Sequence, residues 1–228
     1  MNDLCVCSMV KNEIEILPMF YRYIKEWADS WVVEDQASTD GTLEFLERMK
    51  AKGEMDIDIK VVDCDDFNGD FYKEYNGVIA RANRKWIYTG HVDEFCPTMK
   101  NIIPRLLKRE VIYGFMRYEI CSLNPLLALT RETFLRLWLK DWNLKFKEGE
   151  WIHKEILVDM GRPSVVIDVP YYHIGRCRNV AHIQAKERVY EKCAGKTILT
   201  SSYDELARKL DRQKSYPVKD NGLLDMIL

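Results

Sequence analysis

Three side chains that could bind a metal ion follow a short apolar segment in the first half of the chain. They are His91, Asp93 and Glu94, and they come just after residues 86–88, Trp-Ile-Tyr, which are typical of a buried strand. Ligands of open α/β sheets bind outside the carboxyl ends of the strands. If the chain stays extended here, His91 and Asp93 face one way and Glu94 faces the other. Such ligands suit Mg²⁺ or Mn²⁺ carried with a diphosphate, and the alternative is a set of solvated charges at a strand end.

A second polar group follows the apolar residues 31–33. Residues 38–40, Ser-Thr-Asp, precede a helical pattern, so we expect one of them to cap that helix. Capping does not account for Asp35, which lies upstream of these residues. A carboxylate at this strand end could accept hydrogen bonds from a nucleobase or a ribose.

Candidate acid–base and phosphate-binding residues lie in the second half of the chain. Glu150 and Glu155 flank a histidine and could perform acid–base chemistry, although a surface loop would have the same composition. His173 follows two tyrosines and could equally be a packed histidine. Arg176 and Arg178 belong to a basic group that could contact phosphates or could form a solvated helix face.

The elements that must position these side chains alternate regularly in the first hundred residues. The predicted strands are residues 4–10, 31–33, 57–62 and 86–88, and the predicted helices between them are 16–27, 41–52 and 71–84. This β-α-β-α-β-α-β order predicts an α/β fold with a mainly parallel sheet covered by helices on both faces.

The second half is less regular. It contains predicted helices at 99–108, 181–193 and 203–213, predicted strands at 111–121 and 164–169, the latter ended by Pro170, and an apolar segment at 126–142 that fits a strand or a helix. Because no linker is visible, we expect one domain. Residues 98–228 would build an acceptor region on the half formed by residues 1–97.

Composition excludes some classes of protein. The 228 residues carry a formal net charge of −2, which gives no bulk attraction to nucleic acid or to an anionic membrane. No segment approaches the ~20 apolar residues of a membrane span. The seven cysteines include no CxxC pair, which favours buried thiols in a reducing compartment. We therefore expect a soluble protein in the cytoplasm.

Taken in order, these motifs resemble a glycosyltransferase of the family 2 type with the GT-A fold. The resemblance covers about residues 4–97 well and 150–192 loosely, and the later motifs resemble the branch of lipopolysaccharide-core sugar transferases. The matching segments are CSMVKNE at 7–13, DQASTDGT at 35–42, Asn76 in the helix before the metal motif, HVDEF at 91–95, HKE at 153–155, HIG at 173–175 and KERVY at 186–190.

The resemblance implies that residues 1–97 bind the nucleotide sugar, and it implies roles for individual residues. Asp35 would contact the base, most often uracil, Asp93 would bind the metal, and His173 could complete the shell of the metal or the diphosphate. The other residues implied in nucleotide-sugar binding are Asn12, Glu13, Ser38, Asp40, Asn76, Arg176 and Arg178.

Three positions depart from the family pattern. His91 stands where the family has the first aspartate of the metal motif, so its part in metal binding is open. Tyr75 stands where an arginine often precedes the helix asparagine. Lys154 separates the histidine from the glutamate that usually follows it, so the base could be Glu155 or Glu150.

The implied activity is an inverting, metal-dependent transfer of one sugar. The donor would be a nucleoside diphosphate sugar, most often of UDP, and the acceptor a hydroxyl of a saccharide, a lipid-linked glycan, a protein or a modified nucleic acid base. A carboxylate would take the proton of the attacking hydroxyl, and Mn²⁺ or Mg²⁺ would stabilise the departing diphosphate. The alternatives are a nucleotidyltransferase or nucleotide-sugar hydrolase on the same type of sheet, and a non-catalytic nucleotide-binding module.

Overall fold

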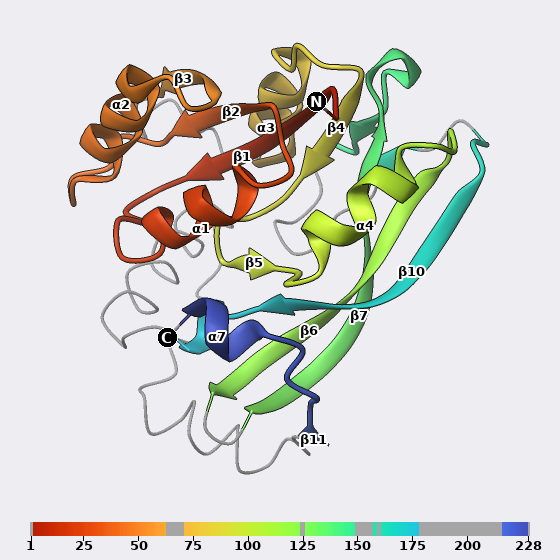
Figure 1. Cartoon of the computed structure of the whole chain (residues 1–228). Helices are drawn as coiled ribbons and strands as arrows, with labels where there is room; N and C mark the ends of the chain where they lie inside the picture. The colour runs from red at the N-terminus through yellow and green to blue at the C-terminus, as the bar shows by residue number, and fades with distance from the viewer. Residues whose placement is uncertain are drawn as a thin grey trace.

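One mixed sheet of nine strands runs through both halves of the chain (Figure 1). The structure is a computed structural model that describes residues 2–62, 71–123, 126–148, 157–158, 161–177 and 216–227. The strand order is β3-β2-β1-β4-β7-β6-β10-β5, with β11 paired to β7. Strands β3, β2, β1 and β4 are parallel to one another, and β7 is antiparallel to both β4 and β6.

The first half confirms the predicted alternation of strands and helices. Its elements are β1 Leu4–Val10, α1 Leu17–Ile24, β2 Ser30–Asp35, α2 Thr42–Lys52, β3 Asp56–Val61, α3 Phe71–Ala80 and β4 Trp86–Thr89. Pro18 lies in the first turn of α1, where its missing N–H leaves no intrahelical bond unmade. Helix α2 ends at Gly53, whose φ of 67° is the left-handed conformation expected at such a stop.

The second half builds the other side of the same sheet. Its elements are β5 Glu94–Phe95, α4 Met99–Leu106, β6 Ile112–Leu123, β7 Leu126–Leu139, the 3₁₀ turn η2 Lys140–Trp142, β8 Lys145–Phe146, β9 Leu157–Val158, β10 Ser164–His173, the 3₁₀ turn η3 Gly175–Cys177, β11 Tyr216–Pro217 and α7 Leu223–Ile227. Strands β8 and β9 pair with each other in a separate small sheet.

Two predictions for the second half are settled by this pairing. The ambiguous segment 126–142 is mostly strand, because β7 bonds β4 on one side and β6 on the other. The prediction that Pro170 ends a strand was wrong, since β10 continues to His173. A register shift between Ile167 and Pro170 allows Pro170 to lie within the strand, although it has no backbone N–H to donate. The predicted helices at 181–193 and 203–213 lie outside the described residues.

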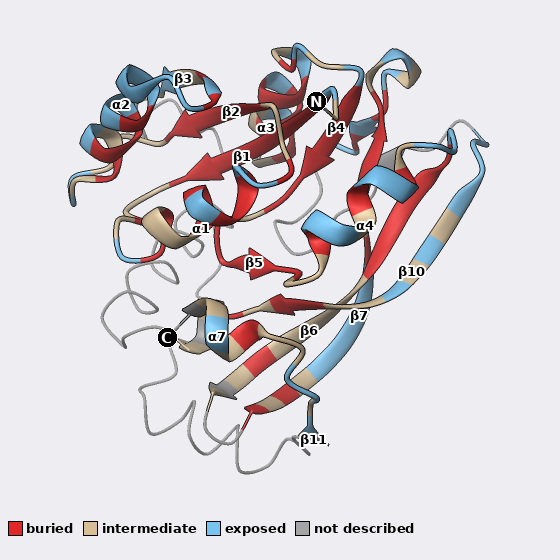
Figure 2. Cartoon of the chain, viewed as in Figure 1, coloured by how far each residue is buried: buried red, intermediate tan, exposed pale blue. Residues whose placement is uncertain are grey.

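The core lies on both faces of the sheet. Every residue of β1 is buried, with Leu4 and Val6 in the cluster that includes α1 and Cys5 and Cys7 in the cluster that includes α3. A strand covered on both faces has no polar alternation, which is why its sequence is continuously apolar. Figure 2 shows the resulting band of buried strands through β2, β1 and β4. Cys5 and Cys7 are free buried thiols, as predicted. No helix among the described residues is long and apolar enough to span a bilayer.

Phe20 of α1 is at the centre of an aromatic cluster, and we predict that Phe20→Ala is strongly destabilising. Its ring centroid lies 5.6 Å from that of Trp31 and 6.2 Å from that of Phe95, and the side chain is 1% exposed. Removing a buried phenylalanine side chain typically costs ~3–5 kcal/mol of unfolding free energy. Urea denaturation measures this loss, with the exposed Glu47→Ala on α2 as the control. Equal stability of the two variants would contradict this packing.

Candidate functional site

The polar loops identified in the sequence lie at one edge of the sheet. Strand β1 is parallel to both β2 and β4, with Val10 opposite Asp35 and Cys7 opposite Thr89. The carboxyl ends of the three strands therefore point the same way (Figure 1). The loops after these strands meet at the edge where open α/β sheets bind their ligands.

The segment after β4 is a tight turn rather than an extended chain. The backbone N–H of Glu94 donates to the carbonyl oxygen of His91 at 3.1 Å, which closes a turn of four residues. Strand β5 begins only at Glu94. The condition under which His91 and Asp93 would share one face, an extended chain, is therefore not met, because the turn gives His91, Asp93 and Glu94 three different surroundings.

Glu94 is a buried anchor of this turn. One carboxylate oxygen accepts from Arg117 and from Arg136, each at 2.9 Å, and the other accepts from the hydroxyl of Tyr171 at 2.6 Å and the backbone N–H of His91 at 3.1 Å. Burial opposes ionisation, but the nearby positive charges of Arg136, His91 and Arg117 outweigh it and hold the pKa of Glu94 well below its usual range. Glu94 is thus an ionised core residue.

Asp93 meets His173 across the sheet. The Oδ2 atom of Asp93 lies 3.3 Å from Nε2 of His173, and the Asp93 side chain is 1% exposed. Strand pairing sets this contact, because β10 places His173 opposite Glu94 of β5 and opposite Glu119 of β6. The backbone N–H of Ile174 also donates to the Asp93 carbonyl at 2.9 Å. The structure therefore joins two predicted metal ligands that are eighty residues apart in sequence.

Glu119 orients the imidazole of His173. Its Oε2 lies 2.6 Å from Nδ1, so the ring is held between two carboxylates. Burial alone would lower the pKa of His173, but the charges of Asp93 and Glu119 raise it to about 10. A carboxylate on the far nitrogen of a histidine is the usual way to orient a metal-binding imidazole. Sequence reasoning missed Glu119, because only the β6–β10 register brings it to the site.

The atoms of Asp93 and His173 fit one side of a divalent-cation site. A Cβ added at Gly175 would lie 2.8 Å from Oδ2 of Asp93 and 2.9 Å from Nε2 of His173. The glycine therefore leaves space beside both atoms. One carboxylate oxygen and one imidazole nitrogen, with the other positions left to phosphate oxygens or water, suit Mn²⁺ or Mg²⁺.

The ring of His91 lies among aromatic side chains. Its ring stacks on Phe71 at a centroid distance of 6.2 Å and lies 6.1 Å from the ring of Tyr75. In the parts of the chain that the structure describes, no three acidic, histidine or cysteine side chains are grouped to hold a metal. The structure brings Asp93 and His173 together, and the part of His91 in metal binding stays a prediction.

Asp35 presents an unpaired acceptor at the end of β2. Its Oδ2 accepts from the backbone N–H of Ser38 at 2.9 Å, whereas Oδ1 is buried and has no hydrogen-bond partner among the described residues. Buried polar atoms are rarely left unsatisfied without a reason.

The loops after β1 and β2 are interlocked by the other predicted binding residues. Ser38 Oγ accepts from the backbone N–H of Asn12 at 2.8 Å, and Asn12 Oδ1 accepts from Thr39 at 2.7 Å. Asp40 Oδ2 accepts from Ile14 at 3.1 Å. Asn12 adopts a φ of 54°, a left-handed conformation in which asparagine is enriched. These side chains fix the shape of the edge that carries Asp35.

The structure partly corrects the prediction that one of residues 38–40 caps helix α2. The N-cap position is Gly41, with a φ of 98° and no side chain to bond, rather than one of residues 38–40. Asp40 still satisfies an orphan amide, because its Oδ1 accepts from the backbone N–H of Thr42 at 3.0 Å. The Thr42 hydroxyl in turn accepts from the backbone N–H of Glu13 at 2.8 Å, and Glu13 is buried.

Asn76 of α3 holds strand β8. Its Oδ1 accepts from the backbone N–H of Phe146 at 2.8 Å, and its Nδ2 donates to the Phe146 carbonyl at 2.9 Å. The amide thus bonds both backbone groups of one residue, which gives Asn76 a positioning role. Glu150, Glu155 and Arg178 lie outside the described residues, as does the side chain of Arg176.

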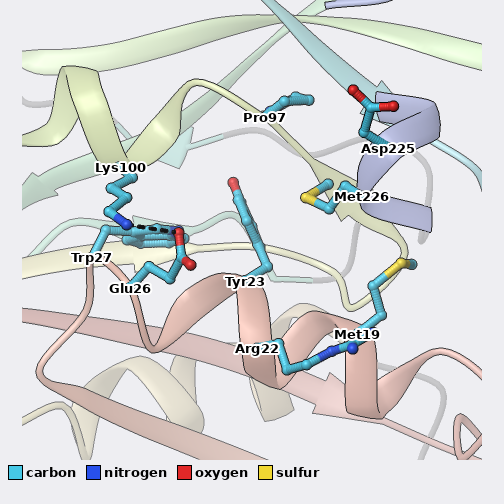
Figure 3. A pocket seen from close by; sticks show the side chains of 9 residues that line it. All are labelled: Met19, Arg22, Tyr23, Glu26, Trp27, Pro97, Lys100, Asp225 and Met226. Atoms are coloured by element: carbon cyan, nitrogen blue, oxygen red, sulfur yellow. Dashed lines mark ion pairs between the residues drawn. The ribbon is translucent and has the colours of Figure 1, made fainter. Parts of the chain in front are cut away.

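A separate pocket of about 320 Å³ lies on the α1 side of the sheet (Figure 3). Tyr23 stands between Trp27 and Met226 of α7, and Lys100 pairs with Glu26 at 3.4 Å. The lining includes neither Asp93 nor His173. The remaining lining residues are Met19, Arg22, Pro97 and Asp225.

Comparisons with known proteins show the fold. No protein-family model matches the sequence, and no curated protein matches it. The structure of S. aureus TarS 1–349 in complex with UDP-GlcNAc is similar with a TM-score of 0.54 at 12% identity, over 84% of this chain and 65% of that TarS segment. The mannosyltransferase PcManGT from Pyrobaculum calidifontis, in complex with GDP-Man and Mn²⁺, is similar with a TM-score of 0.55 at 13% identity, over 94% of this chain and 66% of PcManGT.

The chain therefore has an α/β fold of the GT-A, nucleotidyltransferase-like type, with a mixed, mainly parallel sheet flanked by helices. It spans about two thirds of the length of each of these two structures. The narrower resemblance to lipopolysaccharide-core sugar transferases stays a prediction.

The anchor at Glu94 gives a prediction about stability. In Glu94→Gln the guanidinium of Arg136, which is fully buried, loses its charged partner. Breaking a buried ion pair from one side typically costs ~3–5 kcal/mol of unfolding free energy. Urea denaturation measures the loss. The control is Glu54→Gln, which removes the exposed pair with Lys25 and should change stability little. A Glu94→Gln protein as stable as this control would show that the anchor is unimportant.

Proposed function

We propose that this protein transfers one sugar, with inversion, from a nucleoside diphosphate sugar to an acceptor hydroxyl in a reaction that requires Mn²⁺ or Mg²⁺. The observation that carries the proposal is the contact of Asp93 with His173 beside Gly175 at the ligand-binding edge of the sheet. The GT-A-like fold supports it, since TarS was solved with UDP-GlcNAc and PcManGT with GDP-Man and Mn²⁺.

Asp93 and His173 would hold the cation once Nε2 of His173 gives up its proton, and Glu119 would keep the imidazole turned towards the cation. When bound, a divalent cation supplies positive charge that stabilises the departing diphosphate. His91 would support the shape of the site by packing against Phe71 and Tyr75 and by donating its backbone N–H to Glu94. This assignment keeps the predicted roles of Asp93 and His173 and gives His91 a supporting role.

Asp35 would recognise the base of the donor. Its unpaired Oδ1 could accept a hydrogen bond from a base N–H, such as the imide N–H of uracil, and UDP is therefore the proposed carrier. Asn12, Ser38 and Asp40 would act by holding the loop around this carboxylate. Glu13 lies in the same interlocked segment.

The general base and the arginines that would contact the diphosphate are proposed from the sequence alone. Glu155 or Glu150 would accept the proton of the attacking hydroxyl, a step typically worth ~10²–10⁴-fold in rate. Arg176 and Arg178 would contact the diphosphate. Asn76 would contribute by holding β8, the strand that leads towards Glu150 in the sequence.

Donor binding and turnover test this proposal together. We expect one UDP-sugar to raise the melting temperature in Mn²⁺ but not in EDTA, and to release UDP slowly even to water. Asp93→Asn, His173→Gln and Gly175→Ala should each abolish the Mn²⁺-dependent shift, because they remove a ligand atom or fill the space beside it. Asp225→Asn, which lies in the separate pocket, is the control and should leave the shift intact.

Two results would contradict the proposed reaction, and a third would contradict the proposed site. Release of pyrophosphate in place of UDP would indicate nucleotidyl transfer, and binding of UDP without any turnover of its sugars would indicate a binding module. Loss of the metal-dependent shift in the control Asp225→Asn as well would show that the site is elsewhere.

Base recognition by Asp35 gives a separate prediction. Asp35→Asn places an amide where the acceptor stands, so one hydrogen bond to the base N–H is lost. We expect the Kd of UDP, measured by titration calorimetry in Mn²⁺, to rise about 10-fold or more, as for a single buried hydrogen bond. Asp58→Asn on β3, which is half exposed, is the control. Unchanged UDP affinity in Asp35→Asn would rule out this contact.

A further inference from the structure

Helix α4 and the turn that follows it carry charge of a single sign. Residues 99–109 contain basic side chains and no acidic one, although acidic residues outnumber basic ones in the whole chain. The net charge of −2 therefore conceals a local positive segment. Its basic residues are all exposed, and they are Lys100, Arg105, Lys108 and Arg109. Figure 2 shows exposed residues along the outer side of α4.

The core holds this segment on a rigid support. Met99, Ile103 and Leu106 are buried, so one side of α4 is fixed against the sheet. The hydroxyl of Tyr113 donates to the carbonyl oxygen of Leu106 at 2.6 Å and lies 3.2 Å from that of Arg109. These contacts tie the end of the helix to β6. The basic side chains on the other side of α4 therefore have a fixed place on the surface.

Carboxylates neutralise little of this charge. Within the described part of the chain, the last three of the basic residues form no ion pair. Lys100 pairs with Glu26 at 3.4 Å, but both side chains are more than half exposed, and such pairs are weak. Glu110, the next carboxylate along the chain, pairs with Lys85 at 3.4 Å. The segment thus keeps an uncompensated positive charge.

The helix dipole explains only part of this arrangement. Positive charge is favourable in the last turn of a helix, which accounts for Arg105. The same dipole makes positive charge unfavourable in the first turn, where Lys100 lies. A single-signed surface along the whole of α4 is therefore not a device for stabilising the helix, and its charge is available to an anionic partner.

Apolar side chains at the margins of this surface favour a lipid partner over a nucleic acid. With about 3.6 residues per turn, Ile102 and Leu107 lie on opposite flanks of the exposed side, and both are half-buried. Basic residues next to apolar ones are typical of helices that lie on anionic membranes. Single-stranded nucleic acids are bound with aromatic rings for stacking, and residues 99–109 include no aromatic residue.

From these observations we propose that the protein binds anionic phospholipid surfaces through the exposed side of α4, with Lys100, Arg105, Lys108 and Arg109 facing the head groups. The contact is peripheral and electrostatic. Each basic residue near an anionic leaflet strengthens binding on the order of 5-fold, so the four act together. The proposal does not depend on the sugar-transfer reaction.

Co-sedimentation with vesicles tests this contact without any variant. At low salt the protein should sediment with vesicles of phosphatidylcholine and phosphatidylglycerol in equal parts, and not with vesicles of phosphatidylcholine alone. Added salt should release it, because exposed charges more than about 10 Å apart are screened at 0.1 M ionic strength. Equal binding to both vesicles, binding that resists salt, or no binding to the anionic vesicles would overturn the proposal.

Charge reversal locates the contact on α4. Arg105→Glu/Lys108→Glu should abolish binding to the anionic vesicles. Lys50→Glu/Lys52→Glu makes the same change in net charge at two exposed positions on α2 and should retain most of the binding. Loss of binding in both variants, or retention in both, would contradict the assignment to α4. Melting temperatures check that the variants fold, and the wild-type comparison of the two lipid compositions stands in either case.

A fluorescent single-stranded oligonucleotide tests the other anionic partner. Its anisotropy at low salt should not change when the protein is added at concentrations that saturate the anionic vesicles. Binding of the oligonucleotide that is lost in Arg105→Glu/Lys108→Glu would assign this surface to nucleic acid and overturn the proposal.

Discussion

The burial of Glu94 in an ion-pair cluster is the interaction on which the candidate site depends. Its carboxylate draws Arg117 from β6, Arg136 from β7 and Tyr171 from β10 to the turn after β4. Glu94 is fixed from three strands, so the preceding residue Asp93 has little freedom. A buried carboxylate is tolerated only where its hydrogen bonds and charges are matched, as they are here.

The same cluster couples the two halves of the chain. The parallel strands of the first half bring the loops around Asp35 and Asn12 to one edge. Strands β6 and β10 of the second half bring Glu119 and His173 to Asp93. A site for a nucleoside diphosphate sugar would thus need both halves, with the base near Asp35 and the phosphates near His173. The interlocked loops and the carboxylate-held imidazole would keep this edge preorganised before a ligand arrives.

Much of the first half could be predicted from the sequence, because its signals are local. The apolar run at 4–10, the helical period of 42–52 and the glycine after it each depend on neighbouring residues. Asp93 was named as a metal ligand from the residue types that follow a strand, and His173 was added through a resemblance to a family. The sequence left open whether residues 91–94 stay extended, and the structure shows a turn in which Glu94 bonds back to His91.

The partners of Glu94 and His173 could not be predicted in this way. Arg136 and Glu119 lie on long strands whose facing and register are set by pairing, and a shift of one residue would turn either side chain to the other face. For the same reason the bonds of Asn76 to the backbone of a strand seventy residues later could not be predicted, and its part in nucleotide-sugar binding stays a prediction. Pro170 was expected to end a strand because the register shift that admits it is a property of two strands together.

The most direct test of the central claim is a crystal structure with UDP and Mn²⁺, in which anomalous scattering locates the metal. The account predicts a manganese ion coordinated by Oδ2 of Asp93 and Nε2 of His173, with diphosphate oxygens filling other positions and the uracil imide N–H on Asp35. A UDP molecule bound at this edge with manganese coordinated by other side chains, or with no manganese at all, would contradict it.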